Sequence, residues 1–562
     1  MKRVCQATIL LLLVATLAGA VRSAPADGPT ERVSVSSGGT AGNGESQAPA
    51  ISGDARYVAF HSAADNLVSE DTNGVLDVFL HDRDTGQTRR VSRRSDGQQG
   101  NCDSEAPAIS GGGRTVVFHS CAFNLVPNDT NNVQDVFAYD RNTGEVRRVS
   151  VHTDGTGAND VSGDPSVSGD SQIVAFWSHA DNLIAGDDEG WTDIFLHDQG
   201  TRATWRITVN SFGQGGNGDS QYPAVSNDGR YVVYESDASN LTPGDSGIYR
   251  DIFLFDLETG VTERVSVSDD EQEAEGESFA AAVSGSGRYV AFVSYAANLV
   301  DDDGNSYPDV FVRDRVDGRT MRVNVSNGGD EVEVFETDQE PTFSADGRYV
   351  AFKSRASNLA ANDTNGVGDV FLYDLQAGTI SLASLNSEGI QGNDAGQSPS
   401  LSYDGRYLAF SSVATNLVPH DNNGQRDIFV HDTVGPPPMP ALTINYPTGA
   451  PGSTFTVDGS DYPAGATITV RINNREIAPS APIQTDEEGN FRFLLSTAGA
   501  SEGVYAVEAS AGETTLSVFF RLDTANPVRP QEGDGPVVSV PAGIALDRFS
   551  YLPAVAQEGV WR

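Results

Sequence analysis

The stretch from Ala48 to Arg93 decides the fold, and it reads APAIS-GDA-RYVAFHS-AADNLVSEDTNGVL-DVFLHD-RDTGQT-RRVSR. It is the first of seven copies of one unit, which together run to about residue 434. The serine that follows the first short segment recurs at steps of 58, 58, 58, 58, 60 and 58 residues, as Ser52, Ser110, Ser168, Ser226, Ser284, Ser344 and Ser402. A repeat of this length, made of short strands and turns, is typical of a propeller or an array in which each unit packs on the next.

One copy predicts four strands, at residues 49–52, 56–62, 77–82 and 89–92. The second and third are apolar on both faces, whereas the fourth carries Val91 as its single apolar residue. Strands buried on both faces read as unbroken apolar runs. Burial therefore decreases toward the last strand, as in a propeller blade whose first strand lies at the axis.

The two ends of the repeat region predict how the ring closes. The seventh copy stops after His431 and Asp432 and lacks its fourth strand, while a spare fourth strand stands at residues 31–35. We expect this N-terminal strand to complete the last blade and remove its open edge. The predicted fold is all-β: a seven-bladed β-propeller over residues 28–434, followed by a small β-sandwich.

The turns of the repeat resemble those of the TolB-like propeller family, a WD-type architecture. Ser226-Asn227-Asp228-Gly229 and Ser344-Ala345-Asp346-Gly347 each precede a short apolar strand, like the Ser-Pro-Asp-Gly turn of that family. The resemblance covers about 400 of 562 residues, although no copy has proline in the turn and the loop between strands two and three is longer. It implies the fold and leaves function open, because such folds host binding, scaffolding and enzymatic roles alike.

The segments outside the repeats have different characters. Residues 1–24 have the charged, apolar and small-residue order of a signal peptide, so we expect a protein secreted to the periplasm or the exterior of a bacterium. Residues 435–440 read as a proline-rich linker, and 441–523 as short alternating strands of an immunoglobulin-like sandwich. Residues 524–562 predict a flexible tail.

Charge and hydropathy limit the partners. The chain holds 36 Lys and Arg against 78 Asp and Glu, a net charge of −42. Such a surface repels phosphate backbones, so nucleic acid is not expected as a partner. The apolar run in the signal peptide is too short for a stable membrane span, and no later stretch reaches 18 apolar residues. We expect a monomer without a membrane span.

Aspartates recur in the loop between strands two and three and at the start of strand three of all seven copies. Four copies read D-x-N-[GN]-x-x-D, similar to the calcium loops of FG-GAP propellers and EF-hands. The candidate calcium ligands are Asp71, Asn73, Asp77, Asp129, Asn131, Asp135, Asp363, Asn365, Asp369, Asp421, Asn423 and Asp427. The place of the first ligand holds Ser69, Pro127, Ala361 and Pro419, none of them a carboxylate. The alternative is a set of Asx turns that cap backbone N–H groups.

Cysteine use adds one candidate link. Cys5 lies in the signal peptide, which leaves Cys102 and Cys121 in the second copy. In an oxidising compartment the pair is expected to form a disulfide; the alternative is two free thiols.

The function that these patterns favour is binding or scaffolding, with an acidic, loop-rich propeller face presented to a protein or glycan. No phosphate-binding loop, zinc motif or dinucleotide fingerprint occurs in the sequence. Two alternatives stay open: a calcium-stiffened envelope spacer, and a polysaccharide lyase or hydrolase. The variant loop that contains Glu333 and Glu336 offers an acid pair for such an enzyme.

Overall fold

The computed structural model describes residues 29–543, apart from 188–189, 306, 333, 335, 337–338, 435–440, 461, 487–488, 513 and 533. The chain divides into two compact units, Met1–Gly435 and Pro436–Arg562. The predicted signal peptide (1–24) and linker (435–440) lie outside the described residues. Among the residues described, no helix is long and apolar enough to cross a membrane.

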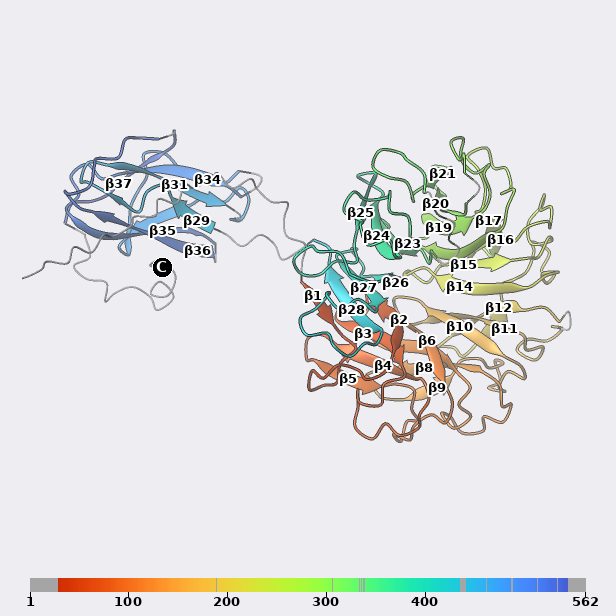
Figure 1. Cartoon of the computed structure of the whole chain (residues 1–562). Helices are drawn as coiled ribbons and strands as arrows, with labels where there is room; N and C mark the ends of the chain where they lie inside the picture. The colour runs from red at the N-terminus through yellow and green to blue at the C-terminus, as the bar shows by residue number, and fades with distance from the viewer. Residues whose placement is uncertain are drawn as a thin grey trace, which may run out of the picture. The chain divides into compact units, whose positions relative to one another are not determined.

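The first unit is a ring of seven antiparallel sheets of four strands each, counted over its described residues (Figure 1). Blades 1 to 3 consist of β2 (Ser46–Ile51), β3 (Tyr57–Ser62), β4 (Asp77–Asp82) and β5 (Gln87–Arg90); β6 (Ser104–Ile109), β7 (Thr115–Ser120), β8 (Asp135–Asp140) and β9 (Val146–Arg148); and β10 (Ser162–Val167), β11 (Ile173–Ser178), β12 (Asp193–Asp198) and β13 (Thr204–Arg206). Blades 4 and 5 consist of β14 (Ser220–Val225), β15 (Tyr231–Ser236), β16 (Asp251–Asp256) and β17 (Val261–Arg264); and β18 (Ser278–Val283), β19 (Tyr289–Ser294), β20 (Asp309–Asp314) and β21 (Arg319–Arg322). Blades 6 and 7 consist of β22 (Thr342–Phe343), β23 (Tyr349–Ser354), β24 (Asp369–Asp374) and β25 (Thr379–Leu382); and β26 (Gly396–Leu401), β27 (Tyr407–Ser412), β28 (Asp427–Asp432) and β1 (Thr30–Arg32).

The N-terminal strand closes the ring as predicted. β1 pairs antiparallel with β28, Thr30 opposite His431 and Arg32 opposite Phe429. The backbone N–H of Val33 then donates to the carbonyl of Ile428 at 2.8 Å. The side chain of Val33 is buried in the core between blades 7 and 1, so the closing segment contributes packing as well as hydrogen bonds.

Each blade packs against the next through apolar side chains of strands two and three. In every blade a Phe or Tyr of strand two lies next to a Phe of strand three, with ring centroids 5.8–6.2 Å apart. The hydrophobic clusters of the ring each contain residues of two neighbouring blades. A blade therefore has no core of its own, and the blades stabilise one another around the ring.

The innermost strands begin earlier than the sequence predicts, at Ser46 in blade 1 rather than at residue 49. The extension is possible because a β-bulge interrupts the pairing of β2 with β3 between Gln47 and Ala50. In six blades one residue of this bulge has a left-handed backbone with φ between 40° and 53°: Ala48, Ala106, Asp164, Tyr222, Ala280 and Ser398. Glu340, with φ 44°, takes the same position in blade 6, and these seven are called the bulge residues below. In blade 6 the inner strand β22 is only two residues long, in the copy with the two-residue insertion.

The turns between strands one and two meet at one end of the ring. Backbone hydrogen bonds of 2.9–3.1 Å join successive turns, from Gly111 to Gly169, Gly169 to Asn227, Asp228 to Gly285, Gly285 to Ala345, Asp346 to Tyr403 and Tyr403 to Gly53. Glycine is needed for this approach: a Cβ at Gly169 would lie 2.1 Å from Asn227 Oδ1, and one at Gly285 would lie 2.3 Å from the Ala345 carbonyl. The turns between strands one and two thus narrow the axial opening at this end of the ring. The long loops between strands two and three lie at the opposite end.

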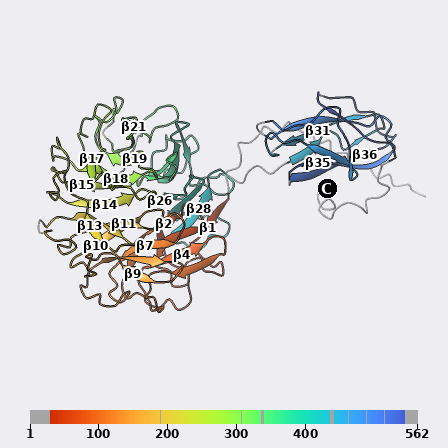
Figure 2. The same ribbon diagram turned by 180° about the vertical axis from the view of Figure 1, so that it is seen from behind.

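The second unit is a two-sheet β-sandwich (Figure 2). Its sheets are ordered β29 (Ala441–Ile444), β31 (Thr454–Ser460), β34 (Phe491–Ser496), β37 (Val537–Ser539), and β30 (Thr448–Gly449), β36 (Thr514–Leu522), β35 (Gly503–Ala511), β32 (Thr469–Ile472), β33 (Arg475–Glu476). Its immunoglobulin-like character stays a prediction. The prediction of a flexible tail from residue 524 is wrong for β37, because this strand pairs parallel with β34 and buries Val538 in the core. Residues 544–562 lie outside the described residues.

Deleting residues 30–36 should destroy the cooperative unfolding of the whole ring, because blade 7 then exposes an edge and the interface between blades 7 and 1 loses Val33. The readout is tryptophan fluorescence during urea unfolding, because three of the four tryptophans, Trp177, Trp191 and Trp205, belong to blade 3, away from the deletion. A transition in blade 3 as sharp, and at the same urea concentration, as in the intact chain would contradict the closure.

Candidate functional site

The predicted calcium loops hold arginines. In six blades an arginine of the outermost strand reaches both the loop aspartate and the strand-three aspartate, at 2.9–3.6 Å. These arginines are Arg90, Arg148, Arg206, Arg264, Arg322 and, from the closing strand, Arg32. The guanidinium neutralises the carboxylates in the place that a calcium ion would take.

The strand-three aspartate has a structural role in all seven blades. In blade 1 the hydroxyl of Ser92 donates to Asp77 Oδ1 at 2.5 Å and accepts the N–H of Val78 at 3.0 Å. A side chain at the position of Ser92 makes the same bond in every copy: Ser34, Ser150, Thr208, Ser266, Asn324 and Ser384. Asn73 donates to Asp77 Oδ2 at 2.8 Å. In blade 1 the side chains of Asp71, Asn73 and Asp77 thus contact other protein groups, while the calcium site and its Asx-turn alternative stay predictions.

The same holds for two of the other three candidate loops. Asn131 donates to Asp135, and Arg148 contacts Asp129 and Asp135. Asn423 donates to Asp427, and Arg32 contacts Asp421 and Asp427. The fourth loop, with Asp363, Asn365 and Asp369, differs because Leu382 stands where the arginine would be.

A cluster of three acids elsewhere follows the same rule. Asp245, Asp251 and Glu273 have carboxylate oxygens within 4.8 Å of one another. Arg264 lies 3.3–3.6 Å from each of them, so its guanidinium occupies the cluster. Burial still raises the pKa of Asp251 to about 6. The arginine was missed in the sequence, although a constant 13-residue interval from the strand-three aspartate marks it in blades 1 to 5.

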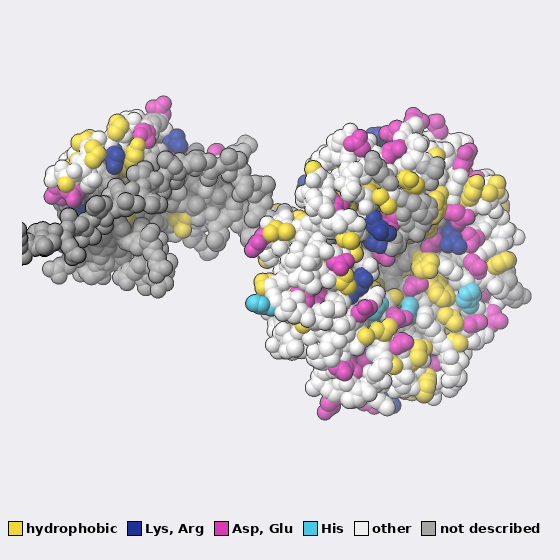
Figure 3. Space-filling view, viewed as in Figure 1, with side chains coloured by type: hydrophobic (Ala, Val, Ile, Leu, Met, Phe, Trp, Pro, Cys, Tyr) yellow, Lys and Arg dark blue, Asp and Glu magenta, His cyan; other side chains and the backbone are white. Residues whose placement is uncertain are grey.

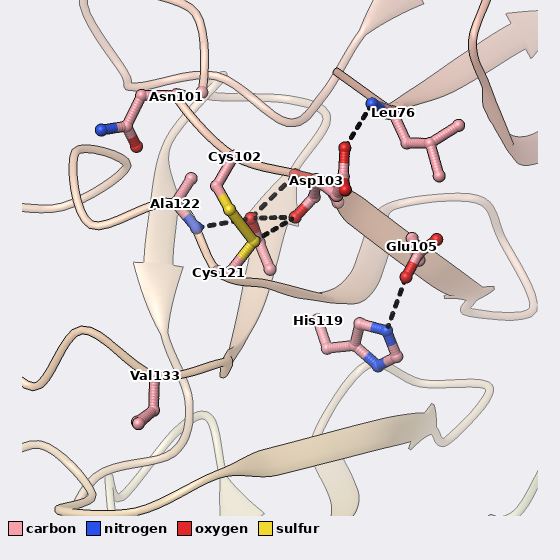
Figure 4. Close-up of a disulfide and its surroundings, with 12 residues drawn as sticks. Leu76, Asn101, Cys102, Asp103, Glu105, His119, Cys121, Ala122 and Val133 are labelled. Carbon is pink, nitrogen blue, oxygen red and sulfur yellow. Dashed lines mark hydrogen bonds and ion pairs between the residues drawn. A yellow bond between two sulfur atoms is a disulfide. The ribbon is translucent and has the colours of Figure 1, made fainter.

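The cysteines reinforce a contact that other blades make without them. Cys102, in the loop between blades 1 and 2, is bonded to Cys121 at the end of β7, with 5.3 Å between the Cα atoms (Figure 4). The N–H of Cys121 also donates to the Asp103 carbonyl at 3.2 Å. Blades 1 and 4 make the equivalent backbone bond alone, from Ala63 to Glu45 and from Asp237 to Asp219. The disulfide is thus a covalent addition to an existing loop contact.

A second group of side chains surrounds the axis at the end opposite the narrow ring of turns. In six blades it consists of the residue before the bulge and the residue that pairs with it on strand two. These pairs are Gln47 with His61, Glu105 with His119, Gly163 with Trp177, Gln221 with Glu235, Phe279 with Val293, and Gln397 with Ser411. In blade 6 the corresponding residues are Gln339 and Lys353. We call this set, with the seven bulge residues, the axial mouth. Figure 3 shows Lys, Arg and His side chains near the centre of the ring and acidic side chains over the surrounding loops.

Contacts within the axial mouth join side chains of one blade and, at His119 and Asp164, of two neighbouring blades. His119 Nδ1 accepts the backbone N–H of Asp164 at 3.2 Å, and its Nε2 lies 3.8 Å from Glu105. The indole N–H of Trp177 donates to Asp164 Oδ2 at 2.8 Å. Burial lowers the pKa of His119 and lowers the pKa of His61 to about 4, so both rings are neutral near pH 7.

Two acids at or next to the axial mouth, Glu235 and Glu336, have surroundings that differ from those of the loop aspartates. Burial raises the pKa of Glu235 to about 7, although Arg250 lies 3.3 Å away. Glu336 is buried, lies 3.3 Å from Lys353 and accepts the N–H of Arg355 at 2.7 Å. Its predicted catalytic partner Glu333 lies outside the described residues. The ion pair with Lys353 gives Glu336 a structural role in blade 6.

No protein-family model matches the chain, and no curated protein does. Among solved structures it is similar to a protein described as TolB from Agrobacterium tumefaciens, with 16% identity, a TM-score of 0.32 and coverage of 49% of this chain and 79% of that one. It is also similar to the β-propeller domain of the Trilobed protease from Pyrococcus furiosus, with 11% identity, a TM-score of 0.41 and coverage of 69% and 93%. The likeness concerns fold alone. The seven-bladed ring itself is defined by the strand pairing.

Replacing Arg90 with leucine should lower the free energy of unfolding by about 3–5 kcal/mol, because the buried Asp71 and Asp77 lose their cation. Arg89 is the matched control, since it is adjacent and only half-buried; its change to leucine should cost less than about 1 kcal/mol. Urea unfolding of both variants measures the difference. Equal losses in the two would show that the arginine does not neutralise the pair.

The histidine of strand three gives a prediction about pH. His197 is 1% exposed, its ring lies 2.9 Å from Thr204 Oγ1, and burial lowers its pKa to about 4. The unfolded chain, with an ordinary pKa near 6.5, therefore binds more protons between pH 6.5 and 4. Stability from neutral His197 is complete above pH 6.5 and falls by about 3 kcal/mol as the pH drops to 4.

His197→Phe should remove this part of the pH dependence, since blade 4 carries Phe255 at the same position. The measurement is the difference in unfolding free energy between the two proteins at pH 7.5 and at pH 4.5. The variant should gain on the parent by about 2–3 kcal/mol at the lower pH. A difference that does not change with pH would contradict the assignment.

Proposed function

We propose that this is an exported binding protein that takes a glycan at the axial mouth. One observation carries the proposal: the seven copies are alike where their strands pack, and six of them share the aspartate–arginine contacts, whereas all seven differ at the axial mouth. The strand-two position there holds His61, His119, Trp177, Glu235, Val293, Lys353 and Ser411. Most of the loop acids are paired with arginines. The side chains of the axial mouth differ from blade to blade, so the mouth can recognise a ligand more specifically than the loops can.

The composition of the mouth favours a polyhydroxylated ligand. Amide side chains of Gln47, Gln221 and Gln397 are half-buried there and can both donate to and accept from hydroxyl groups. Tyr222 is 50% exposed, and its pKa is raised by partial burial and by the nearby charges of Asp164 and Glu235, against the opposing charge of Arg250. An aromatic face next to amides and carboxylates suits a sugar ring, whose C–H face is apolar and whose edge is polar.

Export supports this proposal. The signal-peptide pattern of residues 1–24 and the cysteine pair fit an oxidising compartment outside the cytoplasm, where envelope glycans are the available polymers. The charge of −42 favours neutral over acidic glycans, because like charges repel.

Tyr222→Ala should weaken glycan binding about tenfold or more, by removal of an aromatic contact worth about 1–2 kcal/mol. The change is expected to be structurally mild, because Ala48, Ala106 and Ala280 hold the same left-handed position in other blades. The matched control is Tyr403→Ala, since Tyr403 is 52% exposed in the turn at the opposite end of the axis.

The measurement is retention of both variants and the parent in affinity gels that contain neutral β-glucans, chitin-type glycans or acidic polysaccharides. Retention of the parent and Y403A, together with loss of Y222A, supports the proposal. Capture of the parent by none of the gels, or equal retention of all three proteins, contradicts it. Binding to an envelope protein that Y222A abolishes would replace the glycan with a protein at the same site.

A further inference from the structure

Blade 6 contains a buried acid pair that lacks the cation of the other blades. Asp363 and Asp369 occupy the positions of Asp71 and Asp77, but Leu382 takes the place of Arg90. Among the described residues, neither acid forms an ion pair with a lysine or arginine. Asp363 is 6% exposed and Asp369 is fully buried.

The hydrogen bonds of the pair leave one oxygen unsatisfied. The amide of Gln391 donates to Asp363 Oδ1 and to Asp369 Oδ2, both at 2.8 Å, and Ser384 donates to Asp369 Oδ1 at 2.6 Å. Oδ2 of Asp363 is buried and has no hydrogen-bond partner. The amide bridge carries no charge, so no cation offsets the charges of these two buried carboxylates.

Blade 6 also has oxygen ligands and access from solvent. In blades 4 and 5 the arginine donates to the carbonyl of the residue before the loop aspartate, Gly244 at 3.5 Å and Asp302 at 2.9 Å. Asn362 stands at this position in blade 6 and lines a cavity of about 520 Å³ that also reaches Leu382 and Ala361. Leu382 thus lines this cavity at the position where the other six blades have an arginine.

We propose that blade 6 binds one calcium ion between Asp363 and Asp369, in the place that arginine fills in the other six blades. The two carboxylates, the Asn362 carbonyl and water from the cavity supply the oxygens, and the Gln391 amide gives up its bridge. Calcium accepts such irregular oxygen sets, whereas magnesium requires a near-ideal octahedron. With only two carboxylates the site belongs with the weak calcium sites of extracellular modules, whose Kd is about 10⁻⁴–10⁻³ M.

The test is the thermal midpoint of the mature full chain at pH 7.5 in EDTA, in 10 mM CaCl2 and in 10 mM MgCl2. Calcium should raise the midpoint of the parent by a few degrees, more than magnesium does. Leu382→Arg should melt at least as high in EDTA as the parent does in calcium, and it should not respond to calcium. Leu382→Met is the matched control and should keep the response.

A reciprocal variant tests the same logic in another blade. Arg90→Leu recreates the acid pair of blade 6 in blade 1, and calcium should restore part of the stability that it loses. Equilibrium dialysis with ⁴⁵Ca should count one ion for the parent, none for Leu382→Arg and two for Arg90→Leu. An unchanged parent midpoint in calcium, or an equal calcium response in Leu382→Arg, overturns the site.

Discussion

The structure depends on a buried carboxylate at the start of strand three. In each blade this aspartate accepts a hydrogen bond from a side chain after the outermost strand, and in six blades it also contacts an arginine on that strand. It thereby ties the long loop and the outer edge of the blade to the inner sheet. A buried charge is costly unless it is paired, and in six blades the arginine supplies that pairing. These contacts hold in place a loop of about 14 residues that has no regular secondary structure.

Much of the architecture was predictable from the sequence, because packing repeats with it. The 58-residue interval, the apolar runs of strands two and three, and the missing strand of the seventh copy lead directly to seven blades and their closure. The bulges at Ala48 and its equivalents were not predictable, since alanine carries no mark of a left-handed backbone. β37 was missed because a three-residue strand that pairs only at its partner's edge has no periodic signal of its own.

Much less of the candidate site than of the fold could be predicted from the sequence. The sequence places Asp71, Asn73 and Asp77 in a calcium-like order, but it does not show that Arg90, 13 residues away, enters the same space. A short motif identifies candidate ligands that are close to one another along the chain. It does not identify an arginine on a neighbouring strand that neutralises their charge. For the same reason Leu382, an ordinary residue by itself, becomes informative only beside its six arginine counterparts. The axial mouth, likewise, gathers residues about 58 positions apart that no local pattern connects.

The pairing of β1 with β28 has a consequence for how the molecule is made. The strand synthesised first waits for a partner about 400 residues later, so no nascent chain can seal the ring before almost the entire propeller has left the ribosome. Until then the growing chain carries two open edges, which are prone to pair with other chains. Closure of the ring is therefore a late step, which follows synthesis of the seventh blade.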